Sequence, residues 1–484
     1  MVWLLCLVGA LHVFIFSAAF PFFNNVDEAE HFDLVLKYAH GRIPRKMEPI
    51  SADSAGCLAL MNSYAYFGIP DKFPGGQLPL PLWSEPSEKM QPDLAARKAF
   101  WENLPNYEVS QAPLYYIVAG AWWQTGQWMG WHDGRLVYWL RFLNVAFMAA
   151  LVWLGYAAAR LVFPQTSFLR LGPPALLAFM PQTAFYSIGN DVAAALCFGA
   201  TFVCLLKWVS SEKPSVSLGA VTGLAFAAAY LSKMTNLALL AVAASAVLFK
   251  ITLEARRGKF RAVLPSVVAL LGCAEPPILV WTIWCKSNYG DLTGSSAKIQ
   301  FLGWTVKPFA EWVHHPIFTP GGLWTYVSGE LGTFWQGEFV WHFQPMAIPG
   351  THAMYTIVSL VLVALALPGL RAKPNPLQRQ ALGLSLGCLA AALAFYALLS
   401  IIYDFHDCPA PSREHPYFQA GRMLLGMLIP FLLLFVSGLD RALKRFGNAA
   451  KWIALAGMVS IMLAVEIATD WPVFSSPFNW FHLP

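Results

Sequence analysis

The sequence predicts an all-α membrane protein, a polytopic bundle of about 11 transmembrane helices with structured outer loops. Of the 484 residues, 57% are hydrophobic and only 12% are charged. Soluble domains carry about 25% charged residues. Apolar runs of roughly 18 to 25 residues recur along the chain, and each is long enough to cross a bilayer as a helix. The runs are continuously apolar and do not alternate, so helices are expected and not a barrel.

The expected spans follow one another within a single domain, residues 1–484. They are 2–20, 138–162, 171–188, 192–209, 216–232, 235–250, 262–284, 352–369, 381–402, 423–439 and 452–468. Segment 113–130 is apolar and rich in aromatic residues, but it is short. It either spans or lies at the interface. Three polar stretches are expected to form structured outer loops: 21–137 (with amphipathic helices), 285–350 and 403–420.

Basic residues indicate how the bundle is oriented. If the helices from residue 138 onward alternate, one set of short loops receives most of the lysines and arginines. Examples are Lys207, Arg256, Arg261, Arg371 and Lys444. The positive-inside rule makes that side cytoplasmic. The basic residues are spread over several loops, so they do not form the patch of a nucleic-acid-binding protein.

The first acidic site directly follows the first apolar run, in NNVDEAEHF. Asp27 and His31 are four positions apart and share a helix face, and Glu28 is adjacent. In one interpretation these are favourable first-turn residues on a solvated face, because the helix dipole favours anions there. In the other, a carboxylate acts as a general base or metal ligand near the bilayer surface.

A second acidic site and two basic sites lie at breaks between later runs. Asp191 of SIGND either caps a helix or joins the first acidic site. Lys233 of LSKMTN and Arg422 of QAGRMLLGMLIP either anchor helices at the interface or bind a lipid phosphate. With their polar neighbours, the candidate substrate-binding residues are Asn190, Lys233, Tyr417, Gln419 and Arg422.

Several common catalytic motifs do not occur in the sequence. It contains no Walker A loop, no GxSxG, no HExxH and no dinucleotide fingerprint in a βαβ setting. No stretch is long enough for a soluble nucleotide-using domain. Any chemistry must therefore use the outer loops and the helix ends.

Five short motifs resemble, in the same order, elements of the GT-C superfamily of polytopic glycosyltransferases, in particular of a bacterial branch. They are PFFNNVDEAEHF, QAPLYY, MPQTAFYSIGND, LSKMTN and QAGRMLLGMLIP. The chain departs from that branch at Met423, where tyrosine is usual, and at Ala112, where proline is common. These departures bear on the subfamily more than on the fold.

The resemblance implies a glycosyltransferase whose donor is a polyprenyl-phosphate-linked sugar. Asp27 would deprotonate an acceptor hydroxyl, and the sugar would be transferred with inversion. Glu28 is the less favoured base, and His31 would position Asp27 or contact phosphate. The acceptor would be a glycan, a lipid or a protein, and no nucleic acid is involved.

The resemblance also assigns the remaining site residues. Asp191 would orient a substrate, while Lys233 and Arg422 would hold the phosphate and stabilise charge on the leaving group. No cofactor is predicted, although converging carboxylates leave room for a divalent metal. Segment 113–130 would not cross. The active site would then lie on the extracytoplasmic face of a bacterial cytoplasmic membrane.

Other functions remain open from the sequence. A transporter or flippase of lipid-linked glycans would need polar residues near the bilayer midplane, whereas here they gather at one side. A polymerase or ligase of surface glycans would differ mainly in its substrates. A non-catalytic scaffold would predict that Asp27→Asn has no effect.

Overall fold

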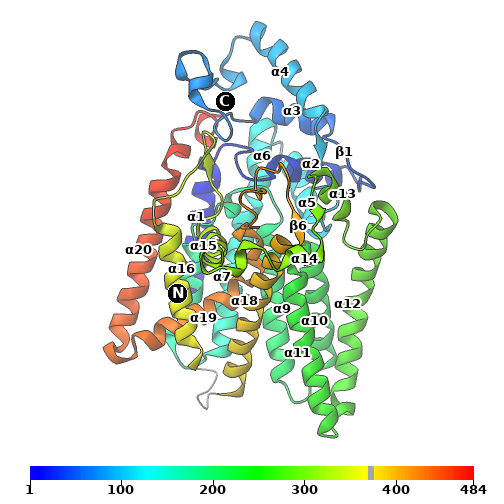
Figure 1. Cartoon of the computed structure of the whole chain (residues 1–484), viewed down its shortest axis with the longest axis vertical. Helices are drawn as coiled ribbons and strands as arrows, with labels where there is room; N and C mark the ends of the chain where they lie inside the picture. Colours follow the sequence, from blue (N-terminus) through cyan, green and yellow to red (C-terminus); the bar gives the residue numbers. More distant parts are fainter. Residues whose placement is uncertain (369–374, 484) are drawn as a thin grey trace.

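The computed structural model describes residues 1–368 and 375–483 and confirms an all-α membrane protein. Within this part of the chain, eight helices or fused helix pairs are long and apolar enough to cross a membrane. Figure 1 shows most of them upright along the long axis. They are α1 (Val2–Ala19), α6 with α7 (Asp133–Arg141, Leu143–Val162), α9 (Asp191–Ser210), η5 with α11 (Met234–Asn236, Leu237–Arg256), α12 (Phe260–Tyr289), α18 (Pro376–Ile402), η7 with α19 (Gly421–Met427, Leu428–Ala442) and η8 with α20 (Lys444–Phe446, Gly447–Phe474).

The other three expected spans are helical but shorter. α10 (Val216–Ser232) and α16 (Thr351–Ala366) are apolar helices of 17 and 16 residues. The expected span 171–188 is wrong in its limits, because α8 (Ser167–Ala178) ends well before residue 188.

The segment after α8 is irregular for a local reason. Pro181 has no backbone N–H to donate and cannot continue the helix. Gln182 then donates through its Nε2 to the carbonyl oxygens of Thr333 and Phe334, at 2.9 and 2.8 Å. Residues 180–191, which we call the second acidic loop, are therefore buried and tied to a distant helix.

The polar stretches form short helices and strand pairs outside the bundle. The helices are α2 (Glu28–Ala39), α3 (Ala52–Met61), α4 (Ser87–Glu102), α5 (Leu114–Trp128), α13 (Ser296–Phe301), α14 (Phe309–Trp312) and α15 (Pro320–Gln336), with 3-10 turns at Pro70–Lys72, Pro74–Gly76, Leu82–Ser84, Thr183–Tyr186, Pro316–Phe318 and Trp480–His482. The antiparallel pairs are β1 (Glu48–Pro49) with β2 (Pro105–Asn106), β3 (Thr305–Val306) with β6 (Tyr403–Asp404), and β4 (Val340–Trp341) with β5 (Gln344–Pro345). Pairing of β3 with β6 joins loops 285–350 and 403–420.

Segment 113–130 contains α5, which lies beside α2 (Figure 1). Its 15 residues are fewer than the roughly 20 that a spanning helix needs. Gly120 allows the close packing, because a Cβ there would lie 2.9 Å from the backbone nitrogen of Ala39. α5 therefore packs on the first outer loop, and it is shorter than a typical spanning helix.

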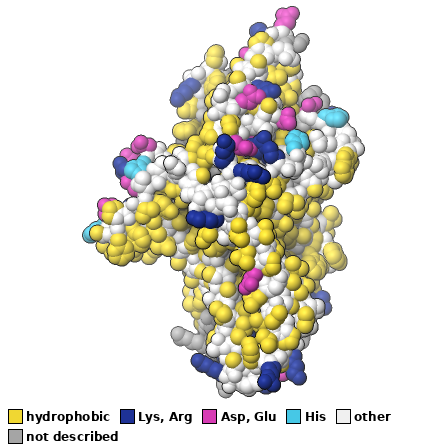
Figure 2. Space-filling view, turned by 90° about the vertical axis from the view of Figure 1, so that its right-hand side faces the viewer, with side chains coloured by type: hydrophobic (Ala, Val, Ile, Leu, Met, Phe, Trp, Pro, Cys, Tyr) yellow, Lys and Arg dark blue, Asp and Glu magenta, His cyan; other side chains and the backbone are white. Residues whose placement is uncertain are grey.

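The two ends of the bundle differ in charge. Figure 1 places α2, α3 and α4 at one end, which we call the outer end, and the α9–α10 and α11–α12 turns at the other. Figure 2 shows lysine and arginine side chains at the lower end, and basic together with acidic side chains in the upper part. Lys207 and Arg256 lie next to those turns, whereas Arg371 falls outside the described residues. The basic loops and the outer loops thus separate as the charge pattern predicts.

Candidate functional site

Arg422 contacts three carboxylates at the outer end of the bundle. Its Nη2 donates to Oδ2 of Asp27 at 2.6 Å, and its Nη1 lies 3.6 Å from Oδ2 of Asp191. Its Nε lies 3.3 Å from Oε2 of Glu338. We call these four residues the Arg422 cluster. Their side chains are only 5 to 21% exposed, so their charges interact more strongly than exposed ion pairs do.

Each member of the cluster lies at a helix end. They are Asp27 at the N-cap of α2, Asp191 at the first position of α9, Arg422 in η7 before α19, and Glu338 just after α15. Gly421 brings η7 against α15, because a Cβ at this position would lie 2.5 Å from the carbonyl oxygen of Glu330. A side chain there would push Arg422 away from the carboxylates.

Both carboxylate oxygens of Asp27 are engaged. Asp27 has the left-handed backbone conformation, φ +61°, and its side chain makes no capping bond to α2. Aspartate is one of the few residues that visit this conformation. Its Oδ1 accepts from the hydroxyl of Tyr107 at 2.8 Å, while Oδ2 accepts from Arg422. The backbone geometry thus turns the carboxylate towards the cluster and away from its own helix.

Asp191 is held by a second cation. Lys233, which follows α10, donates through Nζ to Oδ1 of Asp191. Both side chains are 5% exposed. The preceding residue, Asn190, donates through Nδ2 to Oε1 of Gln111 at 3.1 Å. The predicted residues Asn190, Asp191 and Lys233 therefore meet at one place.

A second ion pair stands beside the Arg422 cluster. Lys298 of α13 donates through Nζ to Oε1 of Glu108, and this Nζ lies 5.1 Å from the ring centroid of Tyr107. The ring of Phe301, also on α13, stacks on Tyr107 with centroids 5.6 Å apart. Gln111 donates through Nε2 to Oε2 of Glu108 at 2.5 Å. α13 thus covers the tyrosine that holds Asp27.

His31, on α2, lies beside the second acidic loop. Its Nδ1 is 2.7 Å from the hydroxyl of Tyr116, on α5. A Cβ at Gly189 would lie 3.5 Å from its Cδ2. This arrangement suits a side chain that supports the second acidic loop more than one that contacts a substrate directly.

Glu28 faces away from the Arg422 cluster. Its Oε1 accepts from Nη2 of Arg141 at 2.7 Å and from the backbone N–H of Ile188 at 2.9 Å. Its Oε2 accepts from the backbone N–H of Phe23 at 3.0 Å. The carboxylate of Glu28 is buried and accepts from four N–H donors of Arg141, Ile188 and Phe23. It therefore joins the first acidic site to the second acidic loop.

Tyr417 and Gln419 also do not join the cluster. Gln419 donates through Nε2 to the carbonyl of Thr325 at 2.5 Å, and its Oε1 lies 2.9 Å from Nε2 of His415. The ring of Tyr417 packs edge-on against His315, with centroids 5.8 Å apart. Both residues hold the loop before η7 against α15.

Charge and burial set the protonation of the outer-end groups. Burial would raise the pKa of Asp27, but the charges of Arg422 and Lys298 outweigh it and hold this pKa below its usual range. Burial and the charge of Asp27 raise the pKa of Glu30 from 4.5 to about 8. Burial lowers the pKa of His31. At neutral pH, Asp27 is therefore ionised, Glu30 protonated and His31 neutral.

Several residues of the site were not predicted. They are Tyr107, Glu108, Gln111, Lys298 and Glu338. The first three immediately precede or begin the QAPLYY motif, which is a weak local signal. Lys298 and Glu338 lie in loop 285–350 without a motif around them, so only the tertiary contacts identify them.

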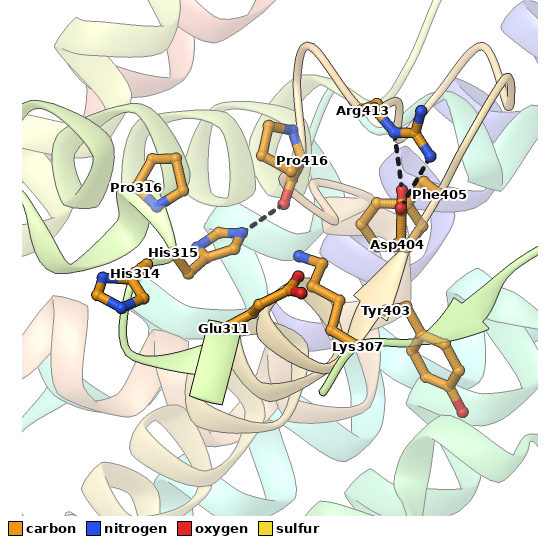
Figure 3. A pocket seen from close by; sticks show the side chains of 10 residues that line it. All are labelled: Lys307, Glu311, His314, His315, Pro316, Tyr403, Asp404, Phe405, Arg413 and Pro416. Carbon is orange, nitrogen blue, oxygen red and sulfur yellow. Dashed lines mark hydrogen bonds and ion pairs between the residues drawn. The ribbon is translucent and has the colours of Figure 1, made fainter. Parts of the chain in front are cut away.

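The space at the Arg422 cluster is small. A cavity of about 10 Å³, enough for one water, is lined by Arg422, Asp191, Glu338 and five neighbouring residues that include Asn25 and Ser187. A larger pocket of about 380 Å³ lies between α14 and β6 (Figure 3). It contains none of the predicted site residues. In it, Nη2 of Arg413 donates to Asp404 at 2.9 Å, and Nε2 of His315 lies 3.0 Å from the carbonyl oxygen of Pro416.

The three carboxylates that could hold a metal already face the guanidinium of Arg422. Among the described residues, no group of three or more histidine, cysteine, aspartate or glutamate side chains is arranged to bind a metal ion. Asp27, Asp191 and Glu338 each face a different nitrogen of Arg422. The guanidinium therefore takes the place between the carboxylates.

Two solved structures are similar to this chain over most of its length. One is the Archaeoglobus fulgidus oligosaccharyltransferase in its apo form, 10% identical, TM-score 0.40, with 97% of this chain and 55% of that chain covered. The other is the archaeal oligosaccharyltransferase AglB from Archaeoglobus fulgidus in complex with an inhibitory peptide and a dolichol-phosphate, 11% identical, TM-score 0.41, with 97% and 56% covered. The chain spans about half the length of these proteins.

No curated protein matches the sequence. A family profile described as "Predicted membrane protein (DUF2142)" matches residues 6–403. This match covers residues 24–32 with the first acidic site, and also Asp191, Lys233 and Glu338. It ends shortly before Arg422. The chain belongs to the DUF2142 family of membrane proteins.

Proposed function

We propose that this protein is a membrane glycosyltransferase of the GT-C type. It moves a sugar from a polyprenyl-phosphate-linked donor to an acceptor hydroxyl, with inversion, and Asp27 is the general base. The acceptor is a glycan, a lipid or a protein. The reaction takes place on the extracytoplasmic face of a bacterial cytoplasmic membrane, where the outer end of the bundle would lie.

The contact between Asp27 and Arg422 carries this proposal. Inverting transfer from a phosphate-linked sugar needs a proton acceptor and a phosphate-binding cation close to one anomeric carbon. Asp27 supplies a carboxylate that is ionised at neutral pH, and Arg422 lies 2.6 Å from it. Arginine suits phosphate because its fork of N–H donors matches the phosphate oxygens.

The proposed step balances without a cofactor. The acceptor O–H proton moves to Asp27 while the acceptor oxygen bonds to the anomeric carbon. The bond from that carbon to the phosphate oxygen breaks, and its electron pair leaves with the polyprenyl phosphate. Arg422 and Lys233 stabilise the charge that develops on this leaving group.

Donor binding also makes Asp27 a better base. While Arg422 contacts Asp27, it holds the pKa of this carboxylate low, and such a carboxylate accepts protons poorly. A donor phosphate bound to another nitrogen of Arg422 offsets part of its positive charge and weakens this stabilisation. The pKa of Asp27 then rises towards its usual range at the moment when the proton has to be transferred.

Transport remains the alternative to transfer. Polar contacts between the described spans include a pair of titratable side chains: Nε2 of His12 on α1 lies 2.8 Å from Oε2 of Glu466 on α20, and both are buried. The pair links two helices and has no connection to the Arg422 cluster in the described contacts. Polar groups that gather at the outer end favour chemistry there. A polymerase or ligase would share this site and differ in its substrates.

The proposal can be tested by mass spectrometry of lipids and surface glycans from cells that lack the protein. We expect one polyprenyl-phosphate sugar to accumulate and one sugar to disappear from a glycan, lipid or protein. The wild-type protein should reverse both changes, and Asp27→Asn should reverse neither. Asp71→Asn is the matched control, because Asp71 is an exposed aspartate of the same loop.

The outcomes separate the candidate functions. Full rescue by Asp27→Asn would refute the assignment of the base and favour transport. A glycan of altered length with all its sugars present would indicate a polymerase or ligase. Accumulation of the donor together with loss of one sugar identifies donor and acceptor in a single experiment.

A further inference from the structure

The three carboxylates around Arg422 are not held equally. Asp27 also accepts a hydrogen bond from Tyr107, and Asp191 also pairs with Lys233. Among the described residues, the one ion-pair partner of Glu338 is Arg422, at 3.3 Å. Its other oxygen, Oε1, is buried and has no hydrogen-bond partner among the described residues. Glu338 is therefore the most weakly held anion of the cluster.

Glu338 also lies at the most accessible side of Arg422. Its side chain is 21% exposed, against 14% for Asp27 and 5% for Asp191. It lines the small cavity together with Asn25, whose Nδ2 is likewise buried and unpartnered within the described part of the chain. An acceptor oxygen placed here would satisfy both Asn25 and Arg422.

The cavity is too small and too negative for a donor as it stands. Its volume of about 10 Å³ holds one water and no phosphodiester. Each of the three guanidinium nitrogens of Arg422 already lies next to a carboxylate. An incoming phosphate must therefore replace one of them, because two anions on one nitrogen repel each other.

We propose that Glu338 occupies, in the donor-free protein, the face of Arg422 that the donor phosphate takes during the reaction. The inference rests on the proposed function and adds to it a residue that controls donor binding and product release. The phosphodiester of the lipid-linked sugar displaces the Glu338 side chain, which then turns into the open side of the cavity. After transfer, the return of Glu338 to Arg422 expels the polyprenyl phosphate.

Two further observations agree with a displaceable side chain. Burial and the like charges of Asp27 and Asp191 raise the pKa of Glu338 despite Arg422, so its ionised form is poorly stabilised where it lies. Glu338 also sits between α15 and β4, directly after Gly337, and not within a helix. Rotation about its side-chain bonds is sufficient to free Arg422, and no helix has to move.

The test measures phosphate binding without turnover. Full-length protein in nanodiscs is titrated with farnesyl phosphate, a short prenyl phosphate, and with farnesol as the probe without phosphate. If Glu338 leaves Arg422 free about one tenth of the time, Glu338→Gln should bind farnesyl phosphate roughly 10-fold more tightly than wild type. Glu338→Ala should do the same. Glu414→Gln, which removes an exposed carboxylate of an outer loop, should have no effect.

Unchanged or weaker binding of farnesyl phosphate by both Glu338 variants would overturn the inference. So would tighter binding of farnesol, because the gain would then not depend on the phosphate. Arg422→Gln should bind more weakly than wild type, and binding equal to wild type would likewise refute the role of this face. These binding measurements do not require Asp27 to act as a base, because no sugar is transferred in them. A failure of the proposed function is recognised separately, by full transfer activity of Asp27→Asn.

Discussion

The carboxylate of Asp27 accepts a hydrogen bond of 2.6 Å from Arg422, a residue 395 positions away in the chain. The contact joins the start of α2 to the helix end before α19. It places a carboxylate and a guanidinium within one candidate site. It also holds the pKa of Asp27 below its usual range.

Asp27→Asn should abolish transfer and preserve phosphate binding. The amide cannot accept the acceptor proton, and loss of a general base lowers rates by about 10²- to 10⁴-fold. The amide oxygen can still accept from Tyr107 or Arg422, so the fold should be retained. Single-turnover transfer and farnesyl phosphate binding, measured on the same preparation with Asp71→Asn as control, check this prediction. Loss of phosphate binding in Asp27→Asn would point to misfolding instead.

Lys298→Met should shift the pH dependence of transfer. The rate, as kcat/KM, falls when the pH drops through the pKa of Asp27, because only the carboxylate accepts a proton. Lys298 helps to lower that pKa, and without it the pKa rises. The acidic limb of the pH profile should therefore move to higher pH. Lys89→Met, at an exposed position of α4, should leave the profile unchanged. A shift in the opposite direction would contradict the assignment of Asp27.

Glu30→Gln should make the protein more stable at alkaline pH. The pKa of Glu30 is raised from 4.5 to about 8 by burial and by Asp27. The folded state therefore binds a proton that the unfolded state has released, and stability falls as the pH rises between these two values. Glutamine stays neutral and removes this loss. Thermal unfolding at pH 5, 7 and 9 should show a gain in Tm that grows with pH. Glu88→Gln, exposed on α4, serves as the control.

Arg141→Met should destabilise the fold without a direct effect on chemistry. Arg141 is buried and pairs with Glu28 at 2.7 Å. Removing one partner of a buried pair costs about 3–5 kcal/mol, because the other charge stays unpaired. The double variant Glu28→Gln with Arg141→Met leaves no lone charge and should recover part of the loss. Denaturant unfolding of the single and double variants measures this, and equal stability of the two would contradict it.

The sequence predicted local features well, but it could not predict which carboxylate of the first acidic site contacts Arg422. Asp27 and Glu28 are neighbours of similar chemistry, and the motif gave no strong reason to separate them. Glu28 is the first residue of α2, whereas Asp27 precedes it with a left-handed backbone, so the two side chains point in different directions. In the structure Asp27 therefore reaches Arg422, while Glu28 reaches Arg141. Only the packing of distant helices decides which carboxylate enters the site.

By itself, the sequence determined the helical membrane fold and indicated four polar residues of the candidate site. Spans are recognisable because bilayer thickness sets the length of an apolar run. Polar groups at span ends are recognisable because burial in lipid is costly. They are Asp27, Asp191, Lys233 and Arg422. Only the tertiary structure decided the limits of α8, the position of α5 and the inclusion of Tyr107, Lys298 and Glu338. These depend on contacts between segments far apart in the chain, and a local pattern carries no information about its distant partner.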